Sequence, residues 1–320
     1  MQRPSCCAAA SGTAESEPPT EPLEWDRHVR PKLASRAGGT PGLPQRTLYG
    51  TTRDHAATAD AVEETLAYDP RMDASDEQRD SMAFPMCQGE AVPWVTVAQM
   101  RDVDRVAIEM GLTLPRMMEN AGANLARLAR SMLGGDTAGR RVVALAGRGG
   151  NGGGGLVAAR RLIGFGADVE VRLAVEPGEL APVPREQLKI LRAMGARITV
   201  GADRLSPPEL FIDAILGYSQ QGSPRGAAAE LVVASQGATV LSLDVPTGLD
   251  LGDASANEPA IRATATLTLA SPKSALGLDA ASALVGDLYL GDISIPAAVY
   301  ERLGIPYSSP FTRDPIVRLV

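Results

Sequence analysis

Short apolar segments alternate with amphipathic helical segments from Trp94 onward, and this alternation constrains the fold more than any other feature of the sequence. Such alternation is typical of α/β domains built on a parallel sheet. Several segments are apolar along their whole length, as expected for strands that helices cover on both faces. The expected strands span residues 141–146, 168–174, 197–200, 210–216, 239–244, 265–269 and 287–295.

Helix boundaries are marked by local signals. Thr96 followed by Gln99 resembles a capping box, and Gly111 ends the apolar stripe that follows it. Pro115 opens a second helix. Further helices are expected over residues 153–165, 185–194, 227–235 and 297–303. The predicted fold is therefore a three-layer, Rossmann-like α/β domain with a mostly parallel, doubly wound sheet and helices on both faces.

The first 92 residues differ in composition from the rest. They are rich in Pro, Ser, Thr, Gly and charge and lack a sustained apolar period, which predicts a disordered acidic tail over 1–92 and a folded domain over 93–320. The net charge is −7 and most of the acidic excess lies in the tail, so no nucleic-acid partner is expected. No segment is long and apolar enough for a membrane span or a secretory signal, and we expect a cytoplasmic protein with no membrane partner.

The distribution of cysteine and histidine restricts the chemistry. All three cysteines and both histidines belong to the predicted tail: Cys6, Cys7, Cys87, His28 and His55. A folded domain without these residue types has no cysteine nucleophile, no histidine base and no Cys/His zinc site. Acid–base work in 93–320 must therefore fall to carboxylates, lysine, tyrosine or bound water. Cysteines without metal or disulfide spacing also suit a reducing cytoplasm.

A run of glycines, Gly147–Gly155 interrupted by Arg148 and Asn151, joins the first strand to the next helix. Glycines let the backbone approach a ligand closely, and a helix N-terminus favours phosphate, so this loop predicts a phosphate cradle. The run also contains G-x-G-x-x-G, and Glu170 could bind a ribose as in a nicotinamide dehydrogenase. Against that alternative, the run is longer than the fingerprint, and no later His or Cys could assist hydride transfer.

Three further loops follow predicted strands. Asp213 interrupts one apolar strand, Asp244 ends another, and Lys273 follows a third. Lys273 is one of only three lysines among 31 basic residues, which suggests a role that arginine cannot fill. Because ligands of an open parallel sheet bind beyond the carboxyl ends of its strands, we expect these groups to share one cleft.

Five ordered motifs resemble the NAD(P)H-hydrate epimerases, whose domain is also called the YjeF N-terminal domain. Together they extend over most of the predicted domain, which makes the resemblance more specific than the glycine pattern alone. The motifs are Met117–Gly122, Gly155–Arg160, Asp213–Gly217, Asp244–Asp250 and Leu267–Lys273.

The resemblance implies epimerisation at C6 of hydrated NADH or NADPH, from R-NAD(P)HX to S-NAD(P)HX. It implies a K⁺ ion held by Asn151, Asp213 and Thr247 and a catalytic Asp244, and we expect Lys273 or the ion to assist. By position, the substrate-binding residues would be Gly150, Asn151, Gly152, Gly153, Gly154, Gly217, Tyr218, Ser219, Gln220, Gln221, Gly222, Ser223 and Asp244.

The resemblance also predicts the partners. NADHX or NADPHX would be the substrate, a separate ADP- or ATP-dependent dehydratase would consume the product, and a homodimer is expected. Two positions depart from the family loop Asn-Asn-Gly-Gly-Asp-Gly: Gly150 replaces the first Asn and Gly154 replaces the Asp. A second hypothesis therefore stays open, in which the chain is a catalytically weak or inactive nucleotide-binding or scaffold module.

Overall fold

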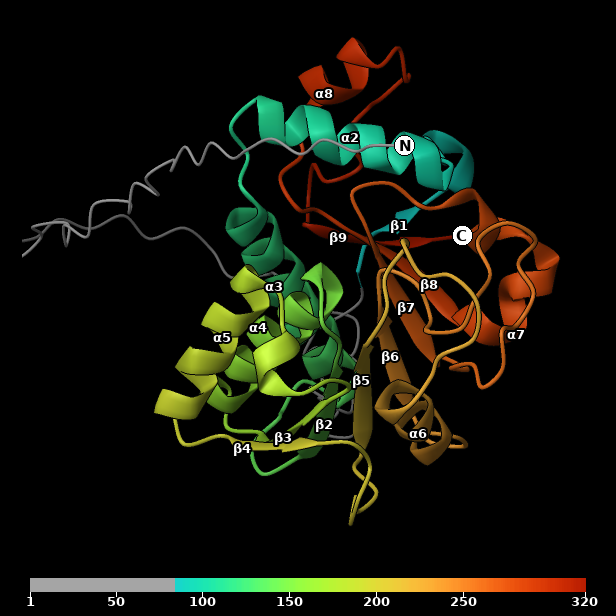
Figure 1. The fold of residues 1–320 in the computed structure, drawn as a ribbon. Coiled ribbons are helices and arrows are strands. Elements are labelled where there is room, and N and C mark those ends of the chain that lie inside the picture. Colours follow the sequence, from blue (N-terminus) through green and yellow to red (C-terminus); the bar gives the residue numbers. More distant parts are fainter. Residues whose placement is uncertain (1–83) are drawn as a thin grey trace, which may run out of the picture. The chain divides into compact units, whose positions relative to one another are not determined.

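The computed structural model describes residues 84–320, which build a nine-stranded sheet (Figure 1). The strand order is β1-β9-β8-β7-β6-β5-β2-β3-β4, and neighbouring strands are parallel except β8 and β9. The strands are β1 (Met86–Cys87), β2 (Arg141–Ala146), β3 (Asp168–Leu173), β4 (Arg197–Val200), β5 (Leu210–Ala214), β6 (Val240–Leu243), β7 (Ala265–Leu269), β8 (Asp287–Gly291) and β9 (Ile316–Leu319).

The sheet is wound in two directions from its middle. The chain passes from β2 outward to β3 and β4, then returns to the other side of β2 and continues through β5, β6, β7 and β8. The point where the direction reverses therefore lies between β2 and β5, and this is where open α/β sheets bind their ligands. The predicted mostly parallel, doubly wound fold is confirmed.

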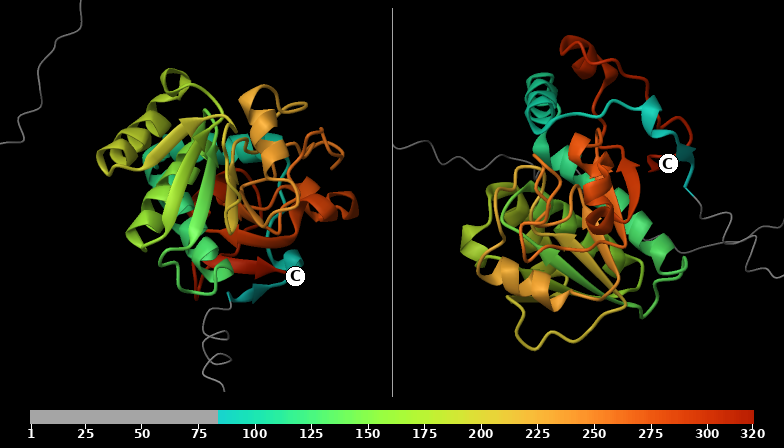
Figure 2. Two further views of the ribbon diagram at one scale, coloured as in Figure 1. Left: turned by 90° about the horizontal axis from the view of Figure 1, so that it is seen from below. Right: turned by 90° about the vertical axis from the view of Figure 1, so that its right-hand side faces the viewer.

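Helices cover both faces of the sheet, as Figures 1 and 2 show. Val142 and Ala144 of β2 pack in the same core cluster as residues of α3 (Leu114–Met132), α4 (Gly150–Gly164) and α5 (Pro182–Ala193). Val143 and Leu145 face the opposite way and pack with α6 (Ala227–Ala234). This alternation follows from the two-residue period of a strand, and it produces the three predicted layers.

A smaller layer is built by α2 (Val97–Glu109) and α8 (Ala297–Arg302). These two helices lie side by side in Figure 1 and in the right-hand view of Figure 2. Helix α2 begins at the predicted capping box, in which the Gln99 amide donates to Thr96 Oγ1 at 3.2 Å. The remaining short helices are α7 (Ser282–Val285) and the 3₁₀ turns η1 (Gly89–Ala91), η2 (Pro177–Glu179), η3 (Ser274–Gly277) and η4 (Asp279–Ala281).

Several predicted boundaries are wrong. Helix α4 begins at Gly150 rather than at residue 153, so most of the glycine run is helical. Strand β8 ends at Gly291 rather than at residue 295, and strand β9 was not predicted. Residues 84–92, assigned to the tail by composition, include β1, which pairs with β9. The predicted disorder of residues 1–83 lies outside the described residues. Among the described helices, none is long and apolar enough to cross a membrane.

Candidate active site

A cavity of about 770 Å³ opens at the reversal point of the sheet. The loop after β2 and the loop after β5 form its floor, and residues from α2 and α3 form its apolar side. Gly147 permits the two loops to meet, because a Cβ at this position would stand 1.8 Å from the Ile215 carbonyl oxygen. The ionisable side chains lining the cavity are Asp104, Arg148, Tyr218, Arg225, Asp244 and Lys273.

Asp244 follows β6 directly and is only 4% exposed. Its backbone has a φ of 68°, in the left-handed region that residues with a side chain seldom adopt. One bond holds its main chain and another its side chain: the Asp244 amide donates to the Leu267 carbonyl at 2.7 Å, and its Oδ2 accepts from the Tyr218 amide at 2.9 Å. The carboxylate is therefore fixed in the cavity wall by the neighbouring loops.

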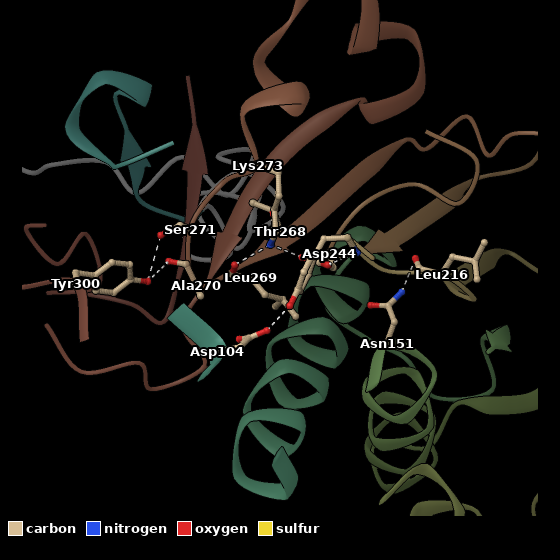
Figure 3. Close-up of polar contacts among 11 residues, drawn as sticks. Asp104, Asn151, Leu216, Asp244, Thr268, Leu269, Ala270, Ser271, Lys273 and Tyr300 are labelled. Atoms are coloured by element: carbon tan, nitrogen blue, oxygen red, sulfur yellow. Dashed lines mark hydrogen bonds and ion pairs between the residues drawn. The ribbon is translucent and has the colours of Figure 1, made fainter. Parts of the chain in front are cut away.

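Lys273 is 1% exposed, and its ammonium group forms an ion pair with Asp244 Oδ1 (Figure 3). The same Nζ donates to the Leu269 carbonyl at 3.0 Å and to Thr268 Oγ1 at 3.3 Å, so all three of its protons have acceptors. A buried ammonium needs such partners to remain charged. Asp244 and Lys273, which the sequence predicted to converge, thus meet in the cavity wall.

The loop that carries Lys273 is held from the other side by α8. Ser271 Oγ donates to Tyr300 Oη at 3.1 Å, and that hydroxyl donates to the Ala270 carbonyl at 3.2 Å (Figure 3). Tyr300 is wholly buried and stacks on Tyr307, with ring centroids 4.1 Å apart. This fixed support is consistent with a lysine whose position matters for function.

Tyr218, predicted as a substrate-binding residue, lines the cavity together with Asp104, which the sequence analysis missed. Its hydroxyl donates to Asp104 Oδ2 of α2 at 2.5 Å, and its ring lies 5.6 Å from Lys273 Nζ. Burial raises the pKa of Asp104, which the Tyr218 bond and the charge of Lys273 counteract. Burial, followed by the bond to Asp104, raises the pKa of Tyr218 far above its ordinary value, so its hydroxyl keeps its proton.

The glycine run divides into two parts with different roles. Gly147, Gly149, Gly150 and Asn151 line the cavity, and a Cβ at Gly150 would meet nothing within 4 Å. The other predicted glycines, Gly152, Gly153 and Gly154, are not among the residues that line the cavity.

Those three glycines instead allow close packing of α4 on its neighbours. A Cβ at Gly152 would lie 1.9 Å from the Gly147 carbonyl oxygen, one at Gly153 would lie 2.3 Å from Met118 Sδ, and one at Gly154 would lie 2.7 Å from Leu243 Cδ2. Sequence analysis assigned the start of this helix to a loop, because glycines needed for packing cannot be distinguished in a sequence from glycines needed for ligand approach.

The loop after β5 lines the cavity with Gly217, Tyr218, Ser219, Gln220, Gln221 and Ser223, whereas Gly222 does not. Gln220 also ties this loop to the one after β6: its amide nitrogen donates to the Pro246 carbonyl at 3.0 Å, and its Oε1 accepts from the Gly248 amide at 2.7 Å. Gly217 separates Asn151 from Asp244, because a Cβ there would lie 3.3 Å from Asn151 Cβ and from Asp244 Oδ2.

The three predicted metal ligands form a connected set beneath the cavity. Asp213 and Thr247 are wholly buried behind the wall, and Asn151 lines it. Asp213 Oδ1 accepts from Thr247 Oγ1 at 2.7 Å and its Oδ2 from the Thr247 amide at 2.9 Å. The Leu216 amide donates to Thr247 Oγ1 at 3.1 Å, and the Leu216 carbonyl accepts from Asn151 Nδ2 at 2.9 Å.

This set fits a monovalent cation. Burial raises the pKa of the Asp213 carboxyl, and the hydrogen bonds from Thr247, Ser242 and the Ile215 amide, all neutral donors, counteract that rise. A wholly buried carboxylate surrounded by neutral donors is stabilised by a cation. Side-chain oxygens and backbone carbonyls are the ligands that hard cations such as K⁺ take.

Glu170 does not support the dehydrogenase alternative. It lies within β3, where its carboxylate pairs with Arg172 at 2.6 Å and with Arg141 at 3.6 Å. The residue is 8% exposed and is not among those that line the cavity. Glu170 therefore neutralises two arginines of the sheet instead of facing a ribose.

Comparison with known proteins places these features in a family. Residues 115–275 match the family model described as YjeF-related protein N-terminus. The chain is 41% identical over 247 residues to an NAD(P)H-hydrate epimerase of Dehalogenimonas lykanthroporepellens, covering 75% of this chain and 98% of the relative. The crystal structure of yeast ynu0 (YNL200c) superposes with a TM-score of 0.59 at 25% identity, covering 71% of this chain and 99% of the yeast chain.

A longer relative carries a second function in its name. The chain is 33% identical over 214 residues to the bifunctional NAD(P)H-hydrate repair enzyme Nnr of Moorella thermoacetica. That match covers 63% of this chain but only 40% of the relative. The chain thus spans less than half the length of this bifunctional protein.

Proposed function

The chain belongs to the family of YjeF-related protein N-termini, and from this premise we propose that it epimerises hydrated NADH and NADPH at C6 of the nicotinamide ring. The proposal depends above all on the buried pair of Asp244 and Lys273 in the wall of a cavity at the reversal point of the sheet. A cavity of about 770 Å³ is large enough for a dinucleotide half, since ligand sites commonly span about 300–1,000 Å³.

The chemistry needs proton transfer and no redox step. Inverting C6 requires the C6–O bond to break and re-form, or the ring to open, and both routes move protons to and from oxygen. Asp244 and Lys273 place a carboxylate and an ammonium group side by side in the cavity wall, and groups of these types exchange protons with bound substrates. The described domain therefore needs neither histidine nor cysteine for this reaction.

Binding of the dinucleotide follows from the rest of the cavity. Gly149 and Gly150 leave the N-terminus of α4 uncovered by side chains, and the backbone amides of a helix N-terminus favour phosphate. Arg148 and Arg225 add positive charge to the same wall. The apolar side, with Met100, Met117 and Met118, would accept the face of a ring.

Asn151, Asp213 and Thr247 would hold a K⁺ ion. When bound, the ion would supply positive charge beneath the loops after β2 and β5 and would offset the burial of the Asp213 carboxylate. A dehydratase specific for the S epimer would consume the product, and longer relatives are named bifunctional NAD(P)H-hydrate repair enzymes. A homodimer and a cytoplasmic location remain expectations of the same family.

The direct test is incubation of purified S-NADPHX with the full chain, followed by proton NMR or chromatography. R-NADPHX should form faster than it does spontaneously. If the parent chain leaves the spontaneous rate unchanged while still binding NADPHX, the inactive binding module describes it better. The loss of the family Asn at Gly150 is compatible with activity, because that position faces open space in the cavity.

A further inference from the structure

Tyr218 links two carboxylates through opposite ends of one residue. Its main-chain nitrogen donates to Asp244 Oδ2 at 2.9 Å, and its phenol donates to Asp104 Oδ2 at 2.5 Å. All three residues line the same cavity, and Asp104 and Asp244 are the only carboxylates among the described residues that do so. The two carboxylates are therefore separated by the length of a tyrosine and face one shared space.

Resting on the proposed function, we propose that Asp104 is a second acid–base group of the site. Helix α2 supplies it, Tyr218 holds it, and it serves the face of the nicotinamide ring opposite to that served by Asp244 and Lys273. Asp104 lies outside residues 115–275, the part of the chain that the family model matches. Its role is suggested by its place in the folded structure.

Epimerisation explains why two groups are useful. In one direction the C6–O bond breaks, its electron pair goes to the departing oxygen, and that oxygen takes a proton from the first group and leaves as water. The lone pair of the ring nitrogen forms a C6=N double bond. A water on the opposite face then gives an electron pair to C6 and its proton to the second group, which leaves one proton moved from the first group to the second.

The charges around Asp104 suit this exchange. Tyr218, Lys273 and Asp244 face Asp104 from the neighbouring loops, and Tyr300 of α8 lies near it. Arg101 of the same helix acts on Tyr218. Burial raises the pKa of Asp104 above its ordinary value, which moves its titration toward neutral pH. Tyr218 keeps its proton and therefore remains a donor that orients the carboxylate.

The first test compares Asp104→Asn with Asp102→Asn in R-to-S turnover of NADPHX. Asp102 lies on the same helix, is 53% exposed and pairs with Arg105, and it does not line the cavity. Asp104→Asn should lower kcat by about 10²- to 10⁴-fold with little change in KM, and Asp104→Glu should recover part of the loss. Asp102→Asn should retain the parent rate.

The second test uses pH. In the direction in which Asp104 accepts a proton from water it must be ionised, so activity in that direction should fall as the pH falls through its pKa. Tyr218→Phe removes a bond that lowers this pKa, so the acid limb of the profile should move to higher pH. In Asp104→Asn the limb should disappear, and in H₂¹⁸O the parent protein should place one solvent oxygen at C6 per inversion.

Three outcomes would overturn the inference: parent kcat in Asp104→Asn, an acid limb that neither variant moves, or retention of the original oxygen by the parent protein. Each of these leaves the epimerase function standing, because the parent chain still turns over. A parent chain without turnover contradicts the proposed function and this inference together. Thermal unfolding of each variant shows whether it is folded, and the isosteric Asn at residue 104 can still accept the Tyr218 bond.

Discussion

Asp244 and Lys273 form an ion pair in which both side chains are almost wholly removed from solvent, 6% and 2% exposed, although 29 positions separate them in sequence. The loops after β6 and β7 each provide one partner, and these strands are neighbours in the sheet. Their meeting is therefore a consequence of the parallel topology.

Removing either partner should lower the stability of the folded protein. Asp244→Asn and Lys273→Met should each lower the free energy of unfolding by about 3–5 kcal/mol, because a charge is left buried without its counter-charge. The double variant should lose less than the sum of the two single losses. Urea denaturation of the four proteins measures this, and additive losses would show that the pair is not coupled.

The same variants should affect catalysis. If Asp244 exchanges a proton with the substrate, Asp244→Asn should lower the rate of NADPHX epimerisation by about 10²- to 10⁴-fold. Asp287→Asn is a suitable control, because Asp287 is an exposed carboxylate on β8 that pairs with Arg318. An Asp244→Asn protein that epimerises at the parent rate would remove this residue from the mechanism.

Two neighbouring glycines should respond oppositely to alanine. Gly150→Ala should be tolerated, since a Cβ there meets nothing within 4 Å and helices favour Ala over Gly by up to about 1 kcal/mol. Gly152→Ala would place a Cβ 1.9 Å from a main-chain oxygen and should lower stability by about 3 kcal/mol. Thermal unfolding separates the two, and equal Tm values would contradict the packing described here.

Potassium should stabilise the protein through Asp213. At a concentration of 100 times its Kd, a ligand of the folded state adds about 2.7 kcal/mol, so Tm should rise with KCl beyond its rise with LiCl. Asp213→Asn will lower stability by itself, because an amide nitrogen cannot accept the bonds that the carboxylate accepts. The decisive quantity is the increment due to K⁺, which Asp213→Asn should abolish and Asp287→Asn should preserve.

Arg148 should contribute to binding of the dinucleotide phosphates. It is exposed at the cavity, and no described residue forms an ion pair with it. Arg148→Ala should raise KM by about tenfold, the loss expected for one hydrogen bond to a charged group. Arg192→Ala, on the outer surface of α5, controls for net charge. An equal effect of both variants would indicate long-range electrostatics rather than contact.

The apolar runs predicted the strands well, because strands covered on both faces have little choice of composition. All seven predicted strands exist, and the strand ends correctly placed Asp244 and Lys273 near each other. Strand β9 was missed because it is short and is far from the centre of the sheet, where it lies between β1 and β8. The apolar residues Ile316, Val317 and Leu319 were the available signal.

Asp104 was missed because α2 was read only for its apolar stripe. The residue lies four positions after Met100, so it shares that buried face of the helix. A carboxylate on an apolar face was the signal that could have identified it. Its partner could not be predicted, because the bond to Tyr218 joins residues 114 positions apart and depends on how α2 lies across the sheet.

Gly154 has a consequence that reaches beyond its own helix. The missing side chain sets how near α4 comes to Leu243, and Leu243 immediately precedes Asp244. A larger residue at 154 would push on the strand whose last peptide orients the reactive carboxyl, so turnover could change without any polar group being touched. Selection for activity would then act on a residue that does not line the cavity.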